Sequence, residues 1–537
     1  MPVKVLILLD FTGILRYNSH MENIILEVEK YKKSVEELTK ENVELKALVK
    51  YYEEQYRLSQ QKKFGSSSEK TPGQTELNFF DEAENESVKH ISEPTALQIT
   101  CTRRKREGKR DEDLSDLPVE TITHSLPEEE RICPECGGVM HVMGHSEPRR
   151  ELKIIPAQVS VAEHVQEVYS CRECDKNNVS VPVIKAPAPE PTVKGGVASP
   201  SSVAHIMVQK YVNAMPLYRQ EREFVMNGFM LSRQTMANWM IYTSERWLEP
   251  LYDMMKSNLL REQVLHADET VLQVLKEQGR KSRMNSYMWL YRTGGISAHP
   301  IVIYEYQETR SSSHPKKFLE GFKGYLHTDG YQGYHVLPQA IKVVGCWAHA
   351  RRKFDEAVKS APPEERSVLP SQKGPDFCSA LFRLEHEYEK LNPEERYQAR
   401  LERSKPLVGQ FYAWVNSVGA LPKSALGRAV HYALEQRPYL EKVFLDGRLE
   451  LSNNRAERSI KPFVIGRKNR LFSATPKGAM ASSVIYSVIE TAKENGLKPF
   501  EYLKYLFETM PNISGVKLDS LLPWSDSLPL YCKLETK

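Results

Sequence analysis

Apolar side chains recur every three or four residues between residues 24 and 56, and this spacing predicts a long amphipathic helix. The seam contains, in order, Ile24, Val28, Tyr31, Val35, Leu38, Asn42, Leu45, Val49, Tyr52 and Tyr56. Alternating steps of four and three, flanked by Glu and Lys, are typical of a coiled coil. Asn42 occupies an a position, where a buried amide often sets register and strand number. We predict a self-associating coiled coil over residues 21–64; the alternative is a single helix packed on its own domain.

From residue 262 onward the pattern changes to short apolar runs that predict five strands. These strands are expected at 264–274, 286–291, 301–304, 324–330 and 343–349, with a short helix at 315–322. Three strands, a helix, a strand, and then a strand that leads into a basic helix is the order of a ribonuclease H-like sheet. We expect this α/β core over residues 261–359, a charged helical insertion over 360–445, and a second part of the core over 446–500. The second part contains a long helix that Gly496 ends.

A helical block over residues 191–260 precedes the strands. Gly228 and Ser232 have the spacing of a helix-turn-helix, in which the glycine makes the turn and the serine caps the second helix. That helix would present Arg233 and Gln234 outward, where they could contact DNA in a groove. The alternative is that the segment serves packing. Its core side chains would then be Leu231, Met236 and Trp239.

Two Cys-x-x-Cys pairs are separated by 34 residues that include strand-like segments. The pairs are Cys133 with Cys136 and Cys171 with Cys174. Each pair can supply two thiolates to a tetrahedral Zn²⁺, and four thiolates leave no open position for catalysis. Eight cysteines in a chain of this length do not make a disulfide scaffold. We predict a structural zinc ribbon over residues 126–190; chance thiols or a redox pair are the alternatives.

Residues 65–125 have the composition of a polar linker that contains a basic arm. Between Thr102 and Arg110 there are six Lys or Arg residues and one Glu. A flexible basic arm can neutralise phosphates and add salt-sensitive affinity for nucleic acid, although a solvated charge run has the same composition. Residues 1–20 form an uncertain extension, and residues 501–537 are expected to be a C-terminal tail.

The overall composition changes this picture little. The 537 residues are 40% hydrophobic and 27% charged, and 74 Lys and Arg against 70 Asp and Glu give a net charge of +4. Such a composition excludes a collagenous, wholly disordered or multispan membrane protein, and no apolar run reaches the roughly 20 residues of a membrane span. We therefore expect a multidomain α+β protein in the cytoplasm, without a membrane partner, whose binding surfaces are local charge clusters.

Three acidic residues occur where they could meet in the predicted sheet. Asp268 lies within the first predicted strand, Asp329 at the end of the fourth, and Glu457 near a helix start. Because those two strands are neighbours in a ribonuclease H-like sheet, the acids are expected to converge, and three carboxylates can bind two Mg²⁺ or Mn²⁺ ions. An acid within an apolar strand costs free energy unless it binds something. The other two acids, Asp329 and Glu457, also have structural explanations. Asp329 and Gly330 are a common turn pair, and Asn454-x-x-Glu457 matches a helix capping box.

Basic side chains surround the third acid. Residues 451–470 carry six of them against Glu457 alone, a local charge of +5. They are Arg455, Arg458, Lys461, Arg467, Lys468 and Arg470. So dense a positive field predicts an anionic partner, and the DNA backbone is the first candidate. Salt bridges to the charged insertion are the competing explanation.

The segment Asn453–Phe472 is similar to the C-terminal signature of the bacterial insertion sequence 66 family of transposases. Other segments that resemble motifs of this family are His327–Tyr331, Cys346–Arg352, Thr491–Gly496 and Leu521–Trp524. The coiled coil and the paired cysteines occur in the same order in that family. The resemblance covers roughly residues 21–530.

This resemblance implies a DDE transposase of the bacterial nucleoid, which binds the terminal inverted repeats of its element, cuts at the ends and joins them to target DNA. Asp268, Asp329 and Glu457 would be the catalytic, magnesium-binding acids, and Cys346 and His349 would support the site. The enzyme is expected to act as a homo-oligomer, with small accessory proteins of the element as further partners. The rival functions are a catalytically inactive DNA-binding regulator and a nuclease of the same fold.

Overall fold

The computed structural model describes most of residues 28–56, then 158–170, 183–362, 369–512 and 518–534, with isolated residues elsewhere. The chain divides into two compact units, residues 1–65 with 159–537 and residues 66–158, and of the second only single residues are described. Several predictions fall outside the described residues and stay predictions. They concern the extension over 1–20, the basic arm, and the zinc ligands Cys133, Cys136, Cys171 and Cys174.

The predicted N-terminal helix is present. Residues 28–43 are helical without a break, and the described residues up to Tyr56 continue the helix. The described apolar side chains of the seam, from Val28 to Tyr56, are between 46% and 70% exposed. An apolar stripe of this length is unfavourable in water unless a partner covers it. The exposed seam therefore favours the coiled-coil interpretation over a helix packed on its own domain.

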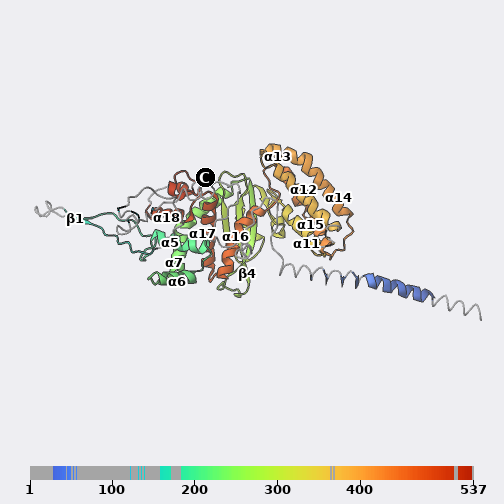
Figure 1. Ribbon diagram of the computed structural model, residues 1–537, viewed down its shortest axis with the longest axis horizontal. Helices are drawn as coiled ribbons and strands as arrows, with labels where there is room; N and C mark the ends of the chain where they lie inside the picture. Colours follow the sequence, from blue (N-terminus) through green and yellow to red (C-terminus); the bar gives the residue numbers. More distant parts are fainter. Residues whose placement is uncertain are drawn as a thin grey trace, which may run out of the picture. The chain divides into compact units, whose positions relative to one another are not determined.

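The core of the first unit is a five-stranded mixed sheet in the order β5–β4–β3–β6–β7. Figure 1 draws its strands in green to yellow and labels β4. Its strands are β3 (Val264–Gln273), β4 (Asn285–Thr293), β5 (Val302–Gln307), β6 (Gly324–His327) and β7 (Ile341–Val344). β3, β4 and β5 form an antiparallel meander, whereas β6 pairs in parallel with both β3 and β7. The first and fourth predicted strands are therefore neighbours, as expected, and the sheet is consistent with a ribonuclease H-like core.

Helix α17 (Pro476–Glu494) packs on the outer strand β5. The N–H of Val302 donates to Oγ1 of Thr491 (3.0 Å), and the N–H of Tyr304 donates to Oγ of Ser487 (2.8 Å). Side chains of a helix thus satisfy amides at the edge of the sheet, which would otherwise be open to another strand. Gly496, with a φ of +68°, follows the helix end as predicted.

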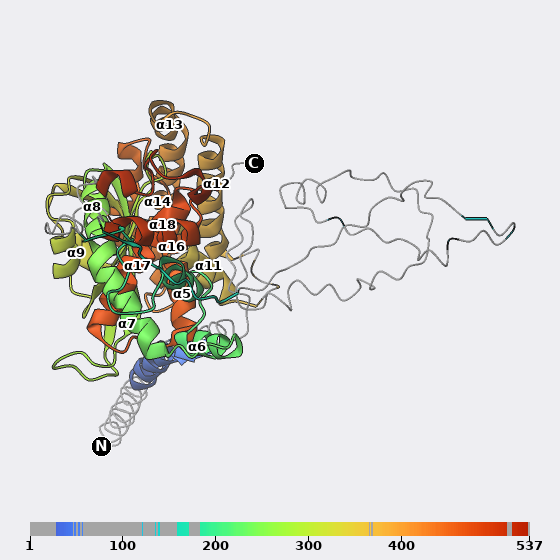
Figure 2. The same ribbon diagram turned by 90° about the vertical axis from the view of Figure 1, so that its left-hand side faces the viewer.

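The helices of the predicted DNA-binding block share the hydrophobic core of the sheet. They are α5 (Pro200–Tyr211), α6 (Leu217–Met226), α7 (Arg233–Thr243) and α8 (Glu249–Leu259). α5 packs on α16 (Asn454–Arg470), α17 and α18 (Pro499–Thr509), and α8 packs on β5. Figure 2 shows α7 and α8 following one another beside α17. The block is thus a layer on the sheet and shares its hydrophobic core.

Part of residues 501–537, expected to be a tail, packs against this core. Helix α18 buries Tyr502, Leu503, Leu506 and Phe507. These positions lie on one face of a helix. The expectation of a tail is therefore wrong for this helix, and the apolar spacing that shows this is present in the sequence. Among the described residues, no helix has the length and apolarity that a membrane span requires.

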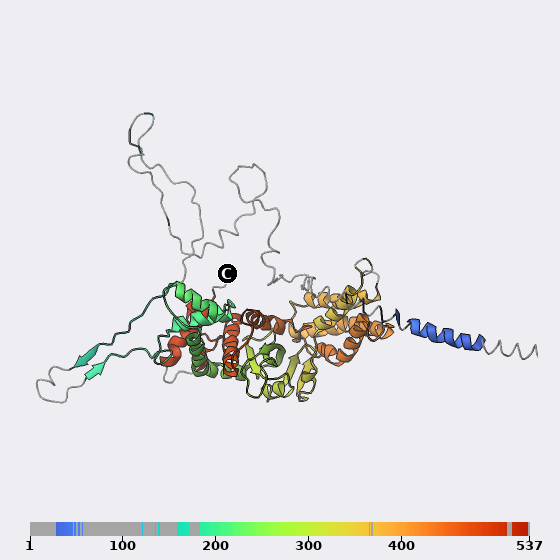
Figure 3. The ribbon, with the colours of Figure 1, turned by 90° about the horizontal axis from the view of Figure 1, so that it is seen from below.

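The insertion over 360–445 is helical, as predicted, and builds a second hydrophobic cluster together with α11 (Trp347–Lys359). Its helices are α12 (Lys373–Glu387), α13 (Pro393–Ala399), α14 (Lys405–Ser417) and α15 (Ala425–Leu440). Trp347 and Phe354 pack edge-on against Phe411 of α14, with ring centroids 5.5 and 5.7 Å apart. Figures 1 and 3 show these helices gathered beside the sheet.

The fifth predicted strand is shorter than expected. β7 ends at Val344 and α11 begins at Trp347, so Cys346 and His349 lie at a helix start and not in a strand. The N–H of Trp347 donates to the carbonyl oxygen of Leu451 (2.9 Å), in the chain segment that leads to α16. The N–H of Trp347 is therefore not available for pairing with a neighbouring strand.

Candidate active site

β3 and β6 place Asp268 beside Asp329. The strands are parallel with His266 opposite His327, and each acid follows its histidine by two residues. Because strand side chains alternate, Asp268 points to the same face as His266, level with the position of Asp329. Oδ1 of Asp268 accepts a hydrogen bond from the N–H of Glu269 (2.8 Å).

Asp329 occupies a tight turn after β6. Its Oδ1 accepts a hydrogen bond from the N–H of Tyr331 (2.9 Å), and Gly330 has a φ of +91°, which other residues rarely adopt. The hydroxyl of Tyr432, in the helical insertion, donates to the backbone oxygen of Asp329 (3.2 Å). Asp329 and Gly330 therefore do form a turn, as the alternative stated. The same turn holds the side chain of Asp329 at the end of β6.

Asn453 fastens the start of α16 to β3. Its Nδ2 donates to the carbonyl oxygen of Ala267, the residue before the first acid (2.8 Å). The side chain of Asn453 makes no cap bond to α16, and the carboxylate of Glu457 lies 3.3 Å from Nε2 of His349 and 3.7 Å from Nη2 of Arg352. The capping-box alternative is therefore wrong, and Glu457 is turned toward α11.

Two buried histidines join these segments. The rings of His266 and His327 stack with centroids 4.5 Å apart. Nδ1 of His266 lies 3.0 Å from Oδ1 of Asn453, and since Nδ2 of that amide is already a donor, Nδ1 carries the proton. Nε2 of His327 accepts from the N–H of Glu450 (3.3 Å). Burial lowers the pKa of His266 to about 3 and the pKa of His327 well below its usual value, so both rings are neutral at neutral pH.

Asp268, Asp329 and Glu457, which we call the acid cluster, influence one another electrostatically. Burial raises the pKa of Asp268 well above its usual value, and the charges of Glu269, Asp329 and Glu457 raise it further. The two histidines bring no compensating charge. A divalent cation among these carboxylates would replace their mutual repulsion by attraction, and carboxylate oxygens are the donors that Mg²⁺ prefers. Among the described residues, however, the ligand atoms that all lie within 4.8 Å of one another are those of Cys346, His349 and Glu457.

Glu269 lies on the opposite face of β3 and was not selected from the sequence. It forms an ion pair with Arg310, and its Oε2 accepts a hydrogen bond from the hydroxyl of Tyr334 (2.6 Å). Burial raises the pKa of Glu269 and the charge of Asp329 adds to the rise, while Tyr334 and Arg310 lower it in part. The charge of Glu269 in turn raises the pKa of Asp268, so Glu269 is coupled to the acid cluster from the opposite face of the strand.

Of the six basic residues around the third acid, Arg455, Arg467 and Arg470 are partly buried and the other three are exposed. Nε of Arg455 donates to Oε1 of Glu450 (2.8 Å) and Nη1 of Arg467 donates to Oγ1 of Thr270 (3.0 Å). Neither bond reaches the insertion. The exposed members are Arg458, Lys461 and Lys468. Spacings of three and seven residues place these three along one side of α16, and we call them the basic stripe.

The helix-turn-helix candidate has its predicted local features. Gly228 has a φ of +81°, and Oγ of Ser232 accepts a hydrogen bond from the N–H of Thr235 (3.1 Å) at the start of α7. Arg233 and Gln234 are exposed. The buried side chains are Leu231, Met236 and Trp239. One face of α7 therefore packs and the other faces solvent, and DNA contact by Arg233 and Gln234 stays a prediction.

Comparison with known protein families places the acids in one conserved domain. Residues 195–481, which contain the whole acid cluster, match the model of the transposase IS66 family. The chain belongs to this family. Residues 130–175 match the zinc-finger binding domain of transposase IS66, and residues 487–524 match the IS66 C-terminal element. Residues 51–122 match a model described as transposase C of IS166 homeodomain.

Similar full-length proteins exist in Sinorhizobium fredii. The uncharacterized protein y4jD is 29% identical over 518 residues, which cover 93% of this chain and 97% of that protein. The uncharacterized protein y4qI is 30% identical over 419 residues, 74% of each chain. The similarity to y4jD thus extends over nearly the whole transposase.

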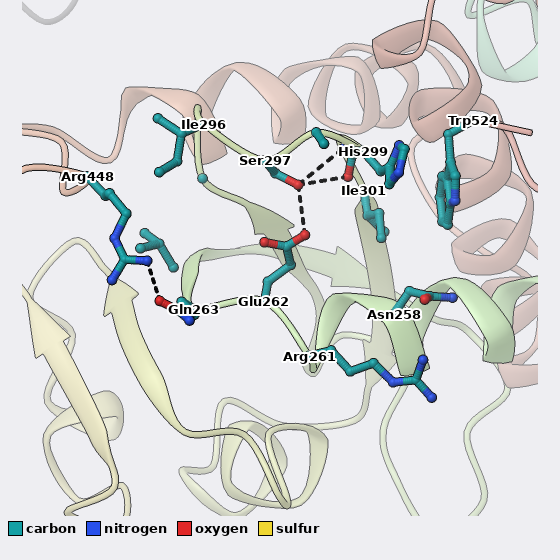
Figure 4. A pocket seen from close by; sticks show the side chains of 13 residues that line it. Asn258, Arg261, Glu262, Gln263, Ile296, Ser297, His299, Ile301, Arg448 and Trp524 are labelled. Atoms are coloured by element: carbon teal, nitrogen blue, oxygen red, sulfur yellow. Dashed lines mark hydrogen bonds between the residues drawn. The ribbon is translucent and has the colours of Figure 1, made fainter. Parts of the chain in front are cut away.

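A pocket of about 410 Å³ lies at the other end of β3 of this transposase (Figure 4). It is lined by residues 261–264 before the strand, by residues between Gly294 and His299, and by Trp524. The ring of His299 stacks on Trp524 with centroids 5.5 Å apart. Asp268 lies four residues beyond this end of the strand and does not line the pocket. The pocket is therefore separate from the acid cluster.

Proposed function

We propose that this member of the transposase IS66 family binds the terminal inverted repeats of its element, cleaves the DNA at those ends and joins them to target DNA. The observation that carries the proposal is the geometry of the acid cluster: the parallel pairing of His266 with His327 brings Asp268 level with Asp329, and the bond of Asn453 to Ala267 holds the start of the helix that carries Glu457 against β3. The proposed metal ligands are Asp268, Asp329 and Glu457. Mg²⁺ or Mn²⁺ bound there would activate the attacking hydroxyl and stabilise the leaving oxygen.

The chain's own residues hold the site together around this chemistry. Asn453 and the paired histidines fix the start of α16 against β3, so that the third acid stays near the first. In cleavage, water attacks the phosphorus and the bond to the 3′ oxygen breaks, which frees a 3′ hydroxyl; in joining, that 3′ hydroxyl attacks the target phosphorus and displaces the target strand's own 3′ oxygen. No covalent bond between protein and DNA is needed in either step.

We propose that the basic stripe binds DNA, together with the partly buried Arg455 and Arg467. We propose the same role for Arg233 and Gln234 of α7. Exposed cations along one helix can neutralise phosphates and release counterions. The coiled coil is proposed to join two copies in the cytoplasm, so that both element ends are handled together, and Cys133, Cys136, Cys171 and Cys174 are proposed to bind a structural Zn²⁺.

The substitution Asp268→Asn tests this function. With labelled element ends and Mg²⁺, we expect cleavage to fall by at least about 10²–10³-fold, because a group that positions charge in the transition state is lost, while binding of the ends persists. Glu490→Gln is the matched control, since Glu490 is a buried acid of α17 that pairs with Lys493. It is expected to cleave like the wild type.

Cleavage by Asp268→Asn at the wild-type rate would contradict the assignment of the acid cluster. Wild-type protein that binds the ends but never cleaves them would instead indicate an inactive regulator. Cleavage without strand transfer would indicate a nuclease.

A further inference from the structure

Glu457 also belongs to a second group of potential ligands, on the side that faces α11. One ligand atom each from Cys346, His349 and Glu457 lie within 4.8 Å of one another. Cys346 is the cap residue of α11 and His349 lies three residues later, so both project to the same side of the helix start. Donor atoms around a tetrahedral zinc lie about 3–4 Å apart, as its bond lengths of about 2.0–2.3 Å require.

The contact between His349 and Glu457 does not satisfy the carboxylate. Nε2 of His349 lies 3.3 Å from Oε1 of Glu457, yet this buried oxygen has no hydrogen-bond donor among the residues that the structure describes. A buried acceptor without a donor is costly. A cation between the two atoms would bind both and remove this cost.

The sulfur of Cys346 also lies in surroundings that suit an anionic ligand. The thiol is buried, with 1% of the residue exposed, and Sγ accepts a hydrogen bond from the N–H of Asn453 (3.1 Å). Burial raises the pKa of the thiol to about 12 and the charge of Glu457 adds to this rise, whereas backbone N–H groups of Asn453, His349 and Ala348 lower the pKa. Without a cation the sulfur stays protonated; hydrogen bonds from N–H groups are what support a metal-bound thiolate.

We propose that Cys346, His349 and Glu457 form a second transition-metal site, with Zn²⁺ as the ion that this donor set prefers. On binding, the thiol proton leaves to solvent and a bond forms between Sγ and the metal. One thiolate, one imidazole and one carboxylate are usual zinc ligands, and three protein ligands leave a fourth position open. Mg²⁺ prefers oxygen ligands alone and is not expected to bind the sulfur.

The site would share Glu457 with the acid cluster. Oε1 faces His349, while Oε2 lies 3.7 Å from the guanidinium of Arg352. An ion held by Cys346 and His349 therefore draws the third acid toward α11 and competes with a magnesium ion for its carboxylate. The inference goes beyond the proposed function and does not depend on strand cleavage, since metal binding is measured without DNA.

Titration of the metal-free full-length protein with Co²⁺ tests the proposal. Tetrahedral cobalt gives visible d–d bands, and each thiolate adds near-ultraviolet charge-transfer intensity. We expect the wild type to bind one equivalent more than Cys346→Ser, with the added intensity of one thiolate. Cys378→Ser is the matched control, because Cys378 is also a buried free thiol but lies in the insertion. It is expected to give the wild-type spectrum.

His349→Ala provides a second variant should Cys346→Ser fail to fold, because the ring is partly exposed and its loss disturbs packing less. Its affinity for the additional cobalt ion is expected to fall by at least about tenfold. Superimposable titrations of the wild type and these variants would overturn the proposal, and the contact of His349 with Glu457 would then be an ion pair only. That result would leave magnesium-dependent cleavage by the wild type unaffected.

Discussion

Two clusters of charged side chains flank α16, and they are built in opposite ways. In the acid cluster, burial raises the pKa of Asp268, and the charges of Glu269, Asp329 and Glu457 raise it further. In the second, which we call the arginine cluster, Arg292 of β4 donates two hydrogen bonds to Glu494 of α17 (3.1 and 3.0 Å) and one to Ser459 of α16. Burial alone would raise the pKa of Glu494, but Arg292 lowers it below the usual value.

The arginine cluster is an example of charges that stabilise the fold, whereas the acid cluster is an example of charges that need a bound cation. The arginine cluster contains its own counterion, so its ionised form stabilises the folded chain. In the acid cluster Glu457 has Arg352 nearby (3.7 Å), but the pKa of Asp268 is raised, so the ionised form of Asp268 costs stability until a cation binds. Sequence position alone does not distinguish the two clusters, because in both the interacting side chains are far apart along the chain.

The largest effect on stability is expected when the arginine cluster is broken. Glu494→Gln leaves the buried guanidinium of Arg292, whose side chain is 3% exposed, without its charged partner. Charge-assisted hydrogen bonds contribute about 1.5–3 kcal/mol, and we expect a loss at the lower end because Glu494 is 36% exposed and remains partly screened by water. Urea unfolding at pH 7 measures the loss.

The pH dependence gives a sharper version of this test. A lowered pKa in the folded state means that the contribution of Glu494 is complete above the usual carboxyl range and is lost as the pH falls through that lowered pKa. The gap in stability between the wild type and Glu494→Gln should therefore narrow in acid. If the difference in stability between the wild type and Glu494→Gln stayed constant with pH, lost packing and not lost charge would explain the lower stability of the variant.

A smaller effect of opposite sign is expected for Asp268→Asn. Because the pKa of Asp268 is raised, the folded state binds more protons than the unfolded state between the usual and the raised value, and stability falls as the pH rises through this window. Asparagine cannot ionise, so the metal-free variant should be more stable than the wild type at pH 7, on the order of 1 kcal/mol. Unfolding in the presence of a chelator measures this gain, and a loss instead would mean that the carboxylate is already compensated.

Much of the fold follows from local patterns in the sequence. Periodicity and turn chemistry act between residues that are close together in the chain. They are enough to predict the strands and their order along the chain, the helix cap at Ser232 and the helix end at Gly496. The two departures, the start of α11 and the packing of α18, come from contacts with other segments. Trp347, for example, leaves the predicted strand because its N–H bonds to Leu451.

The candidate site could be predicted only in part. The carboxylates were selected because acids beside apolar strand residues are rare without a purpose. The residues that support them were missed, because Asn453 meets His266 across 187 positions of the chain. The available signal was that a histidine precedes each strand acid by two residues. Strand alternation places such a pair on one face, but only the folded chain shows that the two rings stack.

The central claim is that the three acids bind a divalent cation together, and titration with Mn²⁺ measures this most directly. Free Mn²⁺, counted by electron paramagnetic resonance, gives the affinity of the full-length protein without DNA. We expect Asp268→Asn, Asp329→Asn and Glu457→Gln each to weaken Mn²⁺ binding by at least about tenfold, and Glu494→Gln, from the arginine cluster, to bind like the wild type. Wild-type affinity in any of the three acid variants would contradict the claim.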